Sequence, residues 1–447
     1  MKRSFAAALL VALPAPALAQ DTTDPREAPP EIEAGVPDAI ADAQVGMAHR
    51  PLGWLSDPEE EPADFFEALV GGKVHLNNRF RIELADTTGR DSSTAITNRI
   101  RLGYETKPFH GFSAMVEFEN VWSPDKDNYF VPATGSGTPT RTVVADPTGT
   151  EVNQFYARFA ERLGGVRLDV RAGRQRILHD DQRFIGNVGW RQFEQTYDSV
   201  RVQTDLGVEG LDLEYAYVWF VQRIFGPDGP NWDSDSHLIR ASYEFAPELR
   251  ATTFVYLLDF RDDAPADSTD TWGVRVSGRT ILDEAEDYTL RYEATYARQS
   301  GAGPNPISYD ADFFAVEAGL NKKGLGGVFA GYQFLGSDKG EAAFRFPLGT
   351  NHAFQGFADN FLATPNDGLQ NLYAGLNTQL PWEINASATY HRFWTDRGGD
   401  DLGWELDGVL SKAITPNWSV LLKGAYYDGS SGEPDTTRFW IQTEFSF

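Results

Sequence analysis

From residue 72 onward, apolar and polar side chains alternate, and this alternation constrains the fold more than any other feature. Phe80 and Ile82, for example, alternate with Arg81 and Glu83. Successive side chains of a β-strand point to opposite faces, so each such segment has one apolar face and one charged face. About ten residues per segment is the length with which a tilted strand crosses a membrane. The pattern predicts an all-β fold for residues 72–447, namely a transmembrane antiparallel β-barrel of about 18 strands. The predicted strands are 73–84, 95–105, 112–122, 152–161, 166–174, 197–204, 211–221, 236–245, 250–259, 271–280, 287–297, 311–321, 326–335, 369–379, 383–393, 402–411, 417–427 and 437–447.

The connections between these segments alternate between long and short. Residues 107–110 and 162–165 are short connections, whereas 123–151 and 336–368 are long. Bacterial barrels have short periplasmic turns and longer outer loops, so we expect both termini in the periplasm. A soluble β-sandwich, the alternative all-β fold, gives no reason for this alternation.

The last predicted strand ends in Phe447 and has an apolar face. This resembles the assembly signal of bacterial outer-membrane proteins. We therefore expect the outer-membrane assembly machinery, outer-membrane lipid and lipopolysaccharide as partners. The final strand must pair with the first, because an open sheet edge in lipid leaves backbone groups without hydrogen bonds.

The N-terminus indicates export. Lys2 and Arg3 precede an apolar run, which ends at Ala17-Leu18-Ala19. These features predict a signal peptide over residues 1–19, too short to span a membrane as a helix, and hence a location in the bacterial outer membrane. Residues 20–71 are rich in Pro, Ala and acidic side chains, which predicts a flexible acidic periplasmic segment. A short helix is possible from Ser56 to Leu69, with Ser56 as its N-cap.

Charge and composition exclude several functions. The chain carries a formal net charge of −26 and has no cysteine. Nucleic acid is therefore not an expected partner, and disulfides and cysteine-based metal sites are excluded. No cofactor is predicted. The outer loops are acidic, but no run matches an EF-hand calcium loop. Bridging to lipopolysaccharide through divalent cations explains these loops more simply.

The inner face of a barrel this wide should enclose an aqueous channel. Its polar face is rich in arginine in the first half of the chain, with acidic side chains among them. One interpretation is a lattice of ion pairs that stiffens the wall. The other is that surplus arginines line a path for a carboxylate-bearing solute, because guanidinium binds carboxylates bidentately and stays charged. These arginines include Arg79, Arg99, Arg101, Arg158 and Arg171.

Residues 173–202 form the most informative segment. The segment begins and ends on predicted strands, and its middle combines charged, aromatic and glycine residues. Such a mixture predicts a loop that folds into the barrel and narrows it, with charges that set selectivity. An outside cap over the barrel is the alternative. The candidate residues in this segment are Arg174, Arg176, Asp181, Arg183, Trp190 and Arg191.

Several of these stretches resemble a known family. The strand patterns NNRFRIEL and TNRIRLGYET, and GRQRILHDDQRF followed by EQTYDSVRV, are similar to alginate-export outer-membrane porins. The resemblance implies an 18-stranded barrel with a narrow, arginine-lined, electropositive pore for the polyuronate alginate. It implies pore-lining roles for Arg79, Arg99, Arg101, Arg174, Arg176, Arg183 and Arg191, with Asp181 pairing among them.

We therefore expect an outer-membrane channel for passive diffusion of an anionic oligo- or polysaccharide, such as alginate or a related uronate, or of a similar acidic solute. A general or differently selective diffusion porin is the alternative. An enzyme is not expected: His179 beside Asp180 and Asp181 is the only suggestive group, and no serine or second histidine stands at a meaningful spacing. A plugged transporter is disfavoured, since the region before residue 72 is too short for a plug domain.

Overall fold

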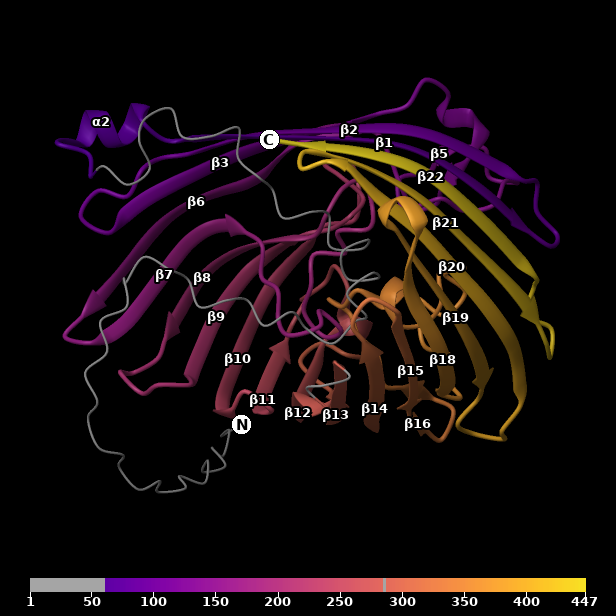
Figure 1. Ribbon diagram of the computed structural model, residues 1–447. Helices are drawn as coiled ribbons and strands as arrows, with labels where there is room; N and C mark the ends of the chain where they lie inside the picture. The colour runs from indigo at the N-terminus through magenta and orange to yellow at the C-terminus, as the bar shows by residue number, and fades with distance from the viewer. Residues whose placement is uncertain (1–60, 284–286) are drawn as a thin grey trace. The chain divides into compact units, whose positions relative to one another are not determined.

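The alternating segments close into a barrel. The computed structural model describes residues 61–283 and 287–447, and in it 18 antiparallel strands form one continuous sheet (Figure 1). Each barrel strand pairs with the next along the chain, and β22 returns to pair with β1, from Asn77 opposite Ser446 to Thr87 opposite Thr436. The predicted 18-stranded barrel is confirmed, and no strand edge of the wall is left open.

The strands agree with the predicted segments within a few residues at most ends. The barrel strands are β1 (Lys73–Thr87), β2 (Ser93–Glu105), β3 (Phe112–Trp122), β6 (Gly149–Leu163), β7 (Val166–Gln175), β8 (Thr196–Thr204), β9 (Leu211–Gln222), β10 (Trp232–Ala246), β11 (Leu249–Leu258), β12 (Thr269–Asp283), β13 (Tyr288–Gly301), β14 (Asp310–Lys322), β15 (Gly326–Leu335), β18 (Leu369–Leu380), β19 (Ile384–Trp394), β20 (Asp401–Thr415), β21 (Trp418–Gly429) and β22 (Thr436–Ser446). The described connections contain four short strands, β4 (Phe130–Val131), β5 (Ser136–Gly137), β16 (Ser337–Asp338) and β17 (Ala342–Ala343). They also contain four 3-10 helices, η1 (Lys126–Asn128), η2 (Pro265–Asp267), η3 (Asn351–Ala353) and η4 (Pro381–Glu383).

The period of two decides which side chains face outward. On β2, Ile100 and Leu102 are exposed on the outside, whereas Arg99 and Arg101, which alternate with them, are buried inside. The same alternation of exposed and buried positions runs along β3 and β22. Lipid tails offer no hydrogen bonds, so an apolar outer face suits them and the charged face is kept within the barrel.

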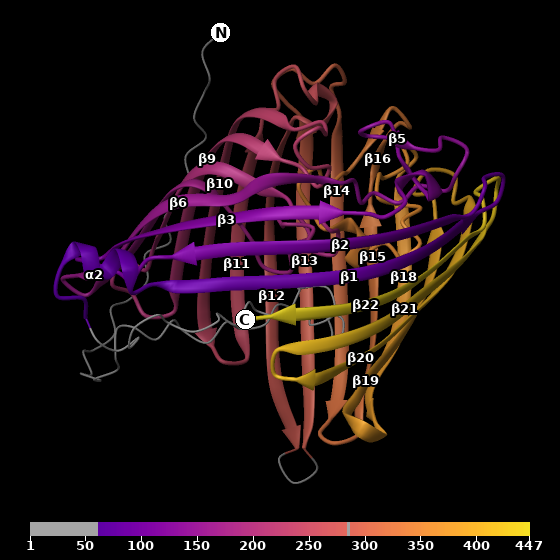
Figure 2. The ribbon, with the colours of Figure 1, turned by 90° about the horizontal axis from the view of Figure 1, so that it is seen from above.

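The barrel has a short-turn end and a long-loop end (Figure 2). Between β6 and β7 the turn is only Gly164 and Gly165, both with positive φ (60° and 92°), which suits the tight hairpin turns that match strand twist. Phe447 exchanges two backbone hydrogen bonds with Leu76, of 3.0 and 2.8 Å. The start of β1 and the end of β22 therefore lie together at the short-turn end.

A short helix, α2 (Phe65–Val70), precedes the barrel. Its N-cap is Asp64, whose side chain accepts a hydrogen bond from the Glu67 amide, and residues 61–64 are not helical. The described part of the predicted helix is therefore shorter than expected, because Asp64 ends it on the N-terminal side. The predicted N-cap Ser56, the signal peptide and residues 20–60 lie outside the described residues. In the described part of the chain, no helix is long and apolar enough to cross a membrane.

Two long loops fold into the barrel and meet there. The β7–β8 loop (176–195) was predicted to do so, and the β15–β18 loop (336–368) was not. Gly186 donates a backbone hydrogen bond of 3.0 Å to Leu348, and Thr350 donates one of 3.0 Å to Gln182. Each loop thus supplies backbone partners to the other, which offsets the cost of removing both from water.

Candidate functional site: the barrel interior and its inward-folded loops

Two arginines lie directly opposite each other on neighbouring strands. Arg79 on β1 is in register with Arg99 on β2, an arrangement that like charges normally disfavour. Glu444 on β22 resolves it: its carboxylate accepts from Arg79 Nε at 2.9 Å and from Arg99 Nη2 at 3.2 Å. One acidic side chain at the closing seam therefore holds two cations of the inner wall.

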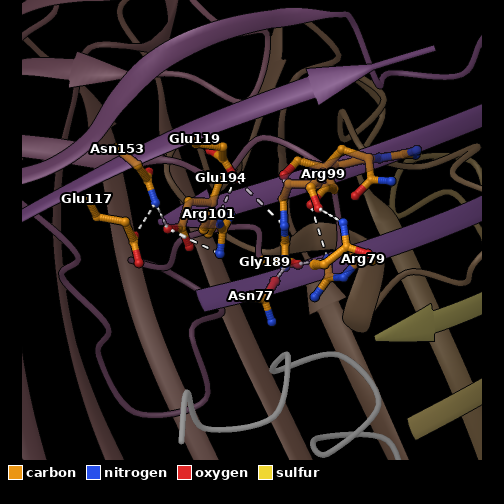
Figure 3. Close-up of polar contacts among 12 residues, drawn as sticks. Asn77, Arg79, Arg99, Arg101, Glu117, Glu119, Asn153, Gly189 and Glu194 are labelled. Atoms are coloured by element: carbon orange, nitrogen blue, oxygen red, sulfur yellow. Dashed lines mark hydrogen bonds and ion pairs between the residues drawn. The ribbon is translucent and has the colours of Figure 1, made fainter. Parts of the chain in front are cut away.

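Arg101 joins the wall to the β7–β8 loop. Its Nε lies 2.5 Å from Glu119 Oε1 on β3, and its Nη1 lies 3.4 Å from Glu194 Oε1 of the loop (Figure 3). Arg176, at the start of the same loop, donates to Glu117 at 2.9 Å and to Glu194 at 2.7 Å. Because Glu194 is buried beside both Arg101 and Arg176, the loop is fixed to β2 and β3 by charge-assisted hydrogen bonds.

Backbone carbonyls of the loop add to this attachment. Arg79 Nη1 donates to the Gly189 carbonyl at 2.9 Å, and Arg81 Nη2 donates to the Trp190 carbonyl at 2.6 Å. Figure 3 shows Gly189 lying toward Arg79 and Arg99. The arginines of β1 and β2 are thus used largely to satisfy loop groups that would otherwise be buried without partners.

A second buried cluster joins both inward loops to β21, which pairs with the closing strand β22. Trp190 stacks on His352 of the β15–β18 loop, with ring centroids 5.1 Å apart and planes 8° apart. Lys423 on β21 places Nζ 2.6 Å from His352 Nε2 and 3.8 Å from the centre of the Trp190 ring. His352 Nδ1 lies 2.6 Å from an oxygen of Asp359, which also pairs with Arg191. We call the cluster of Trp190, Arg191, His352, Asp359 and Lys423 the loop latch.

The charge state of the loop latch follows from its burial. Burial lowers the pKa of His352 to about 3, and the neighbouring Lys423 contributes to this lowering. His352 is therefore neutral near pH 7, so that Nε2 can accept from the lysine while Nδ1–H donates to Asp359. His352 and Arg191 hold the pKa of Asp359 below its usual range, although burial raises it.

The predicted pair Asp181 and Arg183 is also buried. Arg183 Nε lies 3.4 Å from Asp181 Oδ2, and the Arg183 guanidinium sits 3.8 Å from the centre of the Phe354 ring. Asp181 Oδ1 lies 3.2 Å from Arg275 on β12. A cation over an aromatic face gains attraction when water is excluded. Arg183 therefore joins the β7–β8 loop to the β15–β18 loop rather than standing free.

The group around His179 is divided among separate partners. His179 lies 2.8 Å from Glu214 and 2.9 Å from the Tyr256 hydroxyl, both on the wall. Asp180 Oδ1 accepts a hydrogen bond of 2.7 Å from Arg240 Nη2 on β10. Burial raises the pKa of Asp180, but Arg240 and Arg275 lower it to about 2. His179, Asp180 and Asp181 thus face different elements and do not form one catalytic arrangement.

Another set of arginines is less covered. Arg158 on β6 lies 2.6 Å from Asp169 on β7, and Arg171 Nε lies 3.4 Å from the same carboxylate. The side chains of Arg158 and Arg171 are 32% and 25% exposed. Those of Arg79, Arg99 and Arg101 are 3%, 0% and 5% exposed. The two sets were treated alike in the sequence analysis. In the structure, Arg158 and Arg171 are partly exposed to the barrel interior, whereas Arg79, Arg99 and Arg101 are covered.

Arg174 does not belong with the other candidates. It pairs with Asp198 at 2.7 Å and stands opposite Phe155, which is largely exposed on the outer face. Arg171, three residues earlier, faces inward, so the strand alternation places Arg174 on the other side. The expectation that Arg174 lines the pore is corrected: its side chain lies on the outer face near the long-loop end.

Sequence reasoning missed the β15–β18 loop and Lys423. A signal was present, because this long loop carries five phenylalanines between residues 344 and 361, an aromatic content like that of the β7–β8 loop. Lys423 gave no such signal, since a single lysine on an inner face is ordinary. In residues 61–283 and 287–447, no three His, Asp or Glu side chains are placed to hold a metal ion.

Comparisons with known proteins agree with this architecture. The family model described as "Alginate export" matches residues 74–416. Acinetobacter baumannii OccAB2 is similar in structure, with a TM-score of 0.64 and 15% identity over 85% of this chain and 99% of that one. Pseudomonas aeruginosa OpdL has a TM-score of 0.61 and 16% identity over 84% and 99%. Pseudomonas aeruginosa OpdK, solved with vanillate, has a TM-score of 0.62 and 15% identity over 83% and 98%. A search of curated protein sequences gives no match.

The structural likenesses, at such low identity, establish the barrel fold alone, whereas the family model covers most of the chain. The closed 18-stranded wall and its apolar outer face are what an outer-membrane protein requires. The chain therefore belongs to the alginate export family, as an outer-membrane β-barrel channel.

Proposed function

We propose that the channel passes an anionic saccharide, or a similar acidic solute, by passive diffusion along its arginine-bearing wall. The observation that carries this proposal is the exposure of Arg158 and Arg171 inside the barrel, together with Arg167 on β7, which is 33% exposed and lies 2.6 Å from Asp212. We call these three residues the open arginine row. A partly exposed guanidinium can exchange its protein carboxylate for one on a passing solute, because it stays charged and offers several N–H donors to a carboxylate from either source.

The wall across the barrel differs in chemistry. Its half-buried inward positions toward the short-turn end include Asn377 on β18, Asn385 on β19 and Ser411 on β20. Amide and hydroxyl groups donate and accept hydrogen bonds without attracting one sign of charge. An interior with guanidinium groups on one wall and such groups on another suits a solute that carries carboxylates and hydroxyls together, as a uronate does.

A weakly selective diffusion porin is the second candidate, and one observation favours it. Each arginine of the open row contacts an acidic side chain of the wall, so part of its field is cancelled. A second observation supports the first candidate, the channel for an acidic solute. OpdK, a barrel of similar structure, was solved with vanillate, which is a carboxylate. The two candidates differ in how strongly the channel distinguishes charge.

Planar-bilayer recordings test the proposal. We expect reversal potentials in a salt gradient to show anion preference, and an oligouronate to block the current more strongly than a neutral oligosaccharide of equal length. The double variant Arg158→Gln/Arg171→Gln should weaken both effects. Equal block by the acidic and neutral sugars, or cation preference unchanged in the variant, would refute the proposal and favour the general porin.

A further inference from the structure

The helix α2 exposes nearly all of its apolar surface. Phe65, Phe66, Leu69 and Val70 are 67%, 69%, 44% and 49% exposed, and only Ala68 is buried. Four large apolar side chains in a helix of six residues form a contiguous patch, and such patches mark contacts with a partner or a membrane. The described part of the barrel does not cover this patch.

The helix is held against the outer side of the barrel. The Tyr104 hydroxyl donates to the Leu69 carbonyl at 2.7 Å and accepts from the Gly72 amide at 2.9 Å. Tyr104 shares the outward face of β2 with Leu102, two residues away. The Lys107 amide donates to the Ala68 carbonyl at 3.0 Å. These bonds place α2 beside the lipid-facing surface, at the end where β2 stops (Figure 2).

The same rim carries apolar side chains around the short-turn end. Phe65 packs edge-to-face on Phe109 of the adjacent turn, with ring centroids 6.4 Å apart. Exposed large side chains continue around this end of the barrel, at Phe112, Leu163, Leu325, Trp382 and Trp418. Aromatic and aliphatic side chains gather at this level in transmembrane barrels because the headgroup region accepts both apolar and polar contacts. The patch on α2 is continuous with this girdle.

The charged groups of α2 are kept away from the patch. Asp64 caps the helix, and the Glu67 carboxylate accepts from the Ala63 amide at 2.7 Å. Both acids are therefore used within the first turn, which leaves an apolar outer surface. A helix with this division can lie in the plane of a membrane interface with its apolar side in the acyl boundary.

We propose that α2 is an interfacial anchor, embedded in the lipid leaflet at the short-turn end of the barrel. The orientation expected from the loop lengths makes this the periplasmic leaflet of the outer membrane. The anchor fixes the chain entering β1 against the lipid, beside the seam where β22 closes on β1. This inference concerns the outer surface and is independent of the solute that the channel passes.

Spin labels can test the position of the helix, because the chain has no cysteine and any introduced thiol is the only one. Phe66→Cys and Leu69→Cys would be labelled with a nitroxide and the protein folded into phosphatidylethanolamine-rich vesicles. Accessibility to oxygen and to a water-soluble nickel chelate would then be measured by power saturation. Leu102→Cys is the lipid-facing control, and Thr88→Cys, in the exposed turn between β1 and β2, is the aqueous control.

We expect the Phe66 and Leu69 labels to favour oxygen over nickel, at a depth between the membrane surface and the Leu102 label. A nickel accessibility equal to that of Thr88 would show that the helix stands in water and would overturn the proposal. Labels shielded from both reagents would overturn it as well, since a protein segment or a second copy would then cover the patch. Heat-modified gel mobility confirms that each variant has folded before it is measured.

Discussion

Arginines on two parts of the inner wall have opposite surroundings. On β1 and β2, Arg79, Arg99 and Arg101 are buried beneath the inward loops and pair with acids from β3, β22 and the β7–β8 loop. On β6 and β7, the open arginine row pairs only with acids of the wall and keeps part of its surface exposed. The first set holds loops in place, and the second is the set that we propose to meet the solute.

The difference teaches that arginine content alone does not define a charged pore. A buried guanidinium whose hydrogen bonds are satisfied by Glu444 and by loop carbonyls contributes little field to the open interior. The loops, by covering one side of the barrel, decide which arginines remain in contact with water. The following variants test this division, in order of decreasing expected effect.

The largest difference in stability should come from replacing one arginine of each set with glutamine. Arg101→Gln removes the closest cation of the buried Glu119, leaving Arg99 at 3.9 Å, and leaves Glu194 with Arg176, so it should lower the free energy of unfolding by about 3 kcal/mol. Arg171→Gln should cost less than about 1 kcal/mol, because the Arg171 side chain is partly exposed and Asp169 keeps Arg158 as a partner. Urea-induced unfolding in lipid vesicles measures both. Equal losses would show that the two sets are not distinct.

The loop latch offers a more local test. Asp359→Ala leaves Arg191 and His352 without a shared acid, so the two inward loops should loosen and the single-channel current should become larger and noisier, while the barrel stays folded. Asp367→Ala is the matched control, because this acid of the same loop forms an exposed, long pair with Arg397, at 3.8 Å. Unchanged current in Asp359→Ala would mean that the latch does not restrain the loops.

Acidic pH should act on the same latch with a defined sign. The pKa of His352 is about 3 in the folded protein, against 6.5 for an unperturbed histidine, so the neutral form stabilises the packed loops. That stabilisation is complete above about pH 6.5 and is lost progressively as the pH falls toward 3. Channel noise and protease cleavage of residues 336–368 should therefore rise over this interval. In His352→Gln the rise should shrink; an identical pH profile would assign it to other groups.

The smallest effect is expected at Arg174. Arg174→Gln removes an outer, partly exposed pair with Asp198, so ion selectivity should not change, and stability should change by less than about 1 kcal/mol. Reversal potentials compared with those of Arg171→Gln provide the measurement. A loss of anion preference in Arg174→Gln as large as that in Arg171→Gln would place this side chain on the solute path.

Much of the wall could be predicted because lipid imposes a simple rule on every strand. Alternation identified all 18 strands, and the segment 173–202 was correctly expected to fold inward. The error at Arg174 arose because it was grouped with the inward loop of the segment 173–202. It still lies on β7, an odd number of positions from the inward Arg171, so it faces outward. The β15–β18 loop was missed because long loops have no periodicity, and their contacts with the wall depend on residues far along the chain.

The sequence alone therefore determined the barrel, its strand number, its closure and the face on which most strand residues lie. These follow from a period of two and from the need to pair every strand in lipid. Only the tertiary structure decided which inward arginines are covered. Arg79 and Glu444 are 365 positions apart, and Trp190 meets His352 and Lys423 only after three separate segments have folded together. Such contacts depend on how loops fill a closed space, and no local pattern along the chain encodes that.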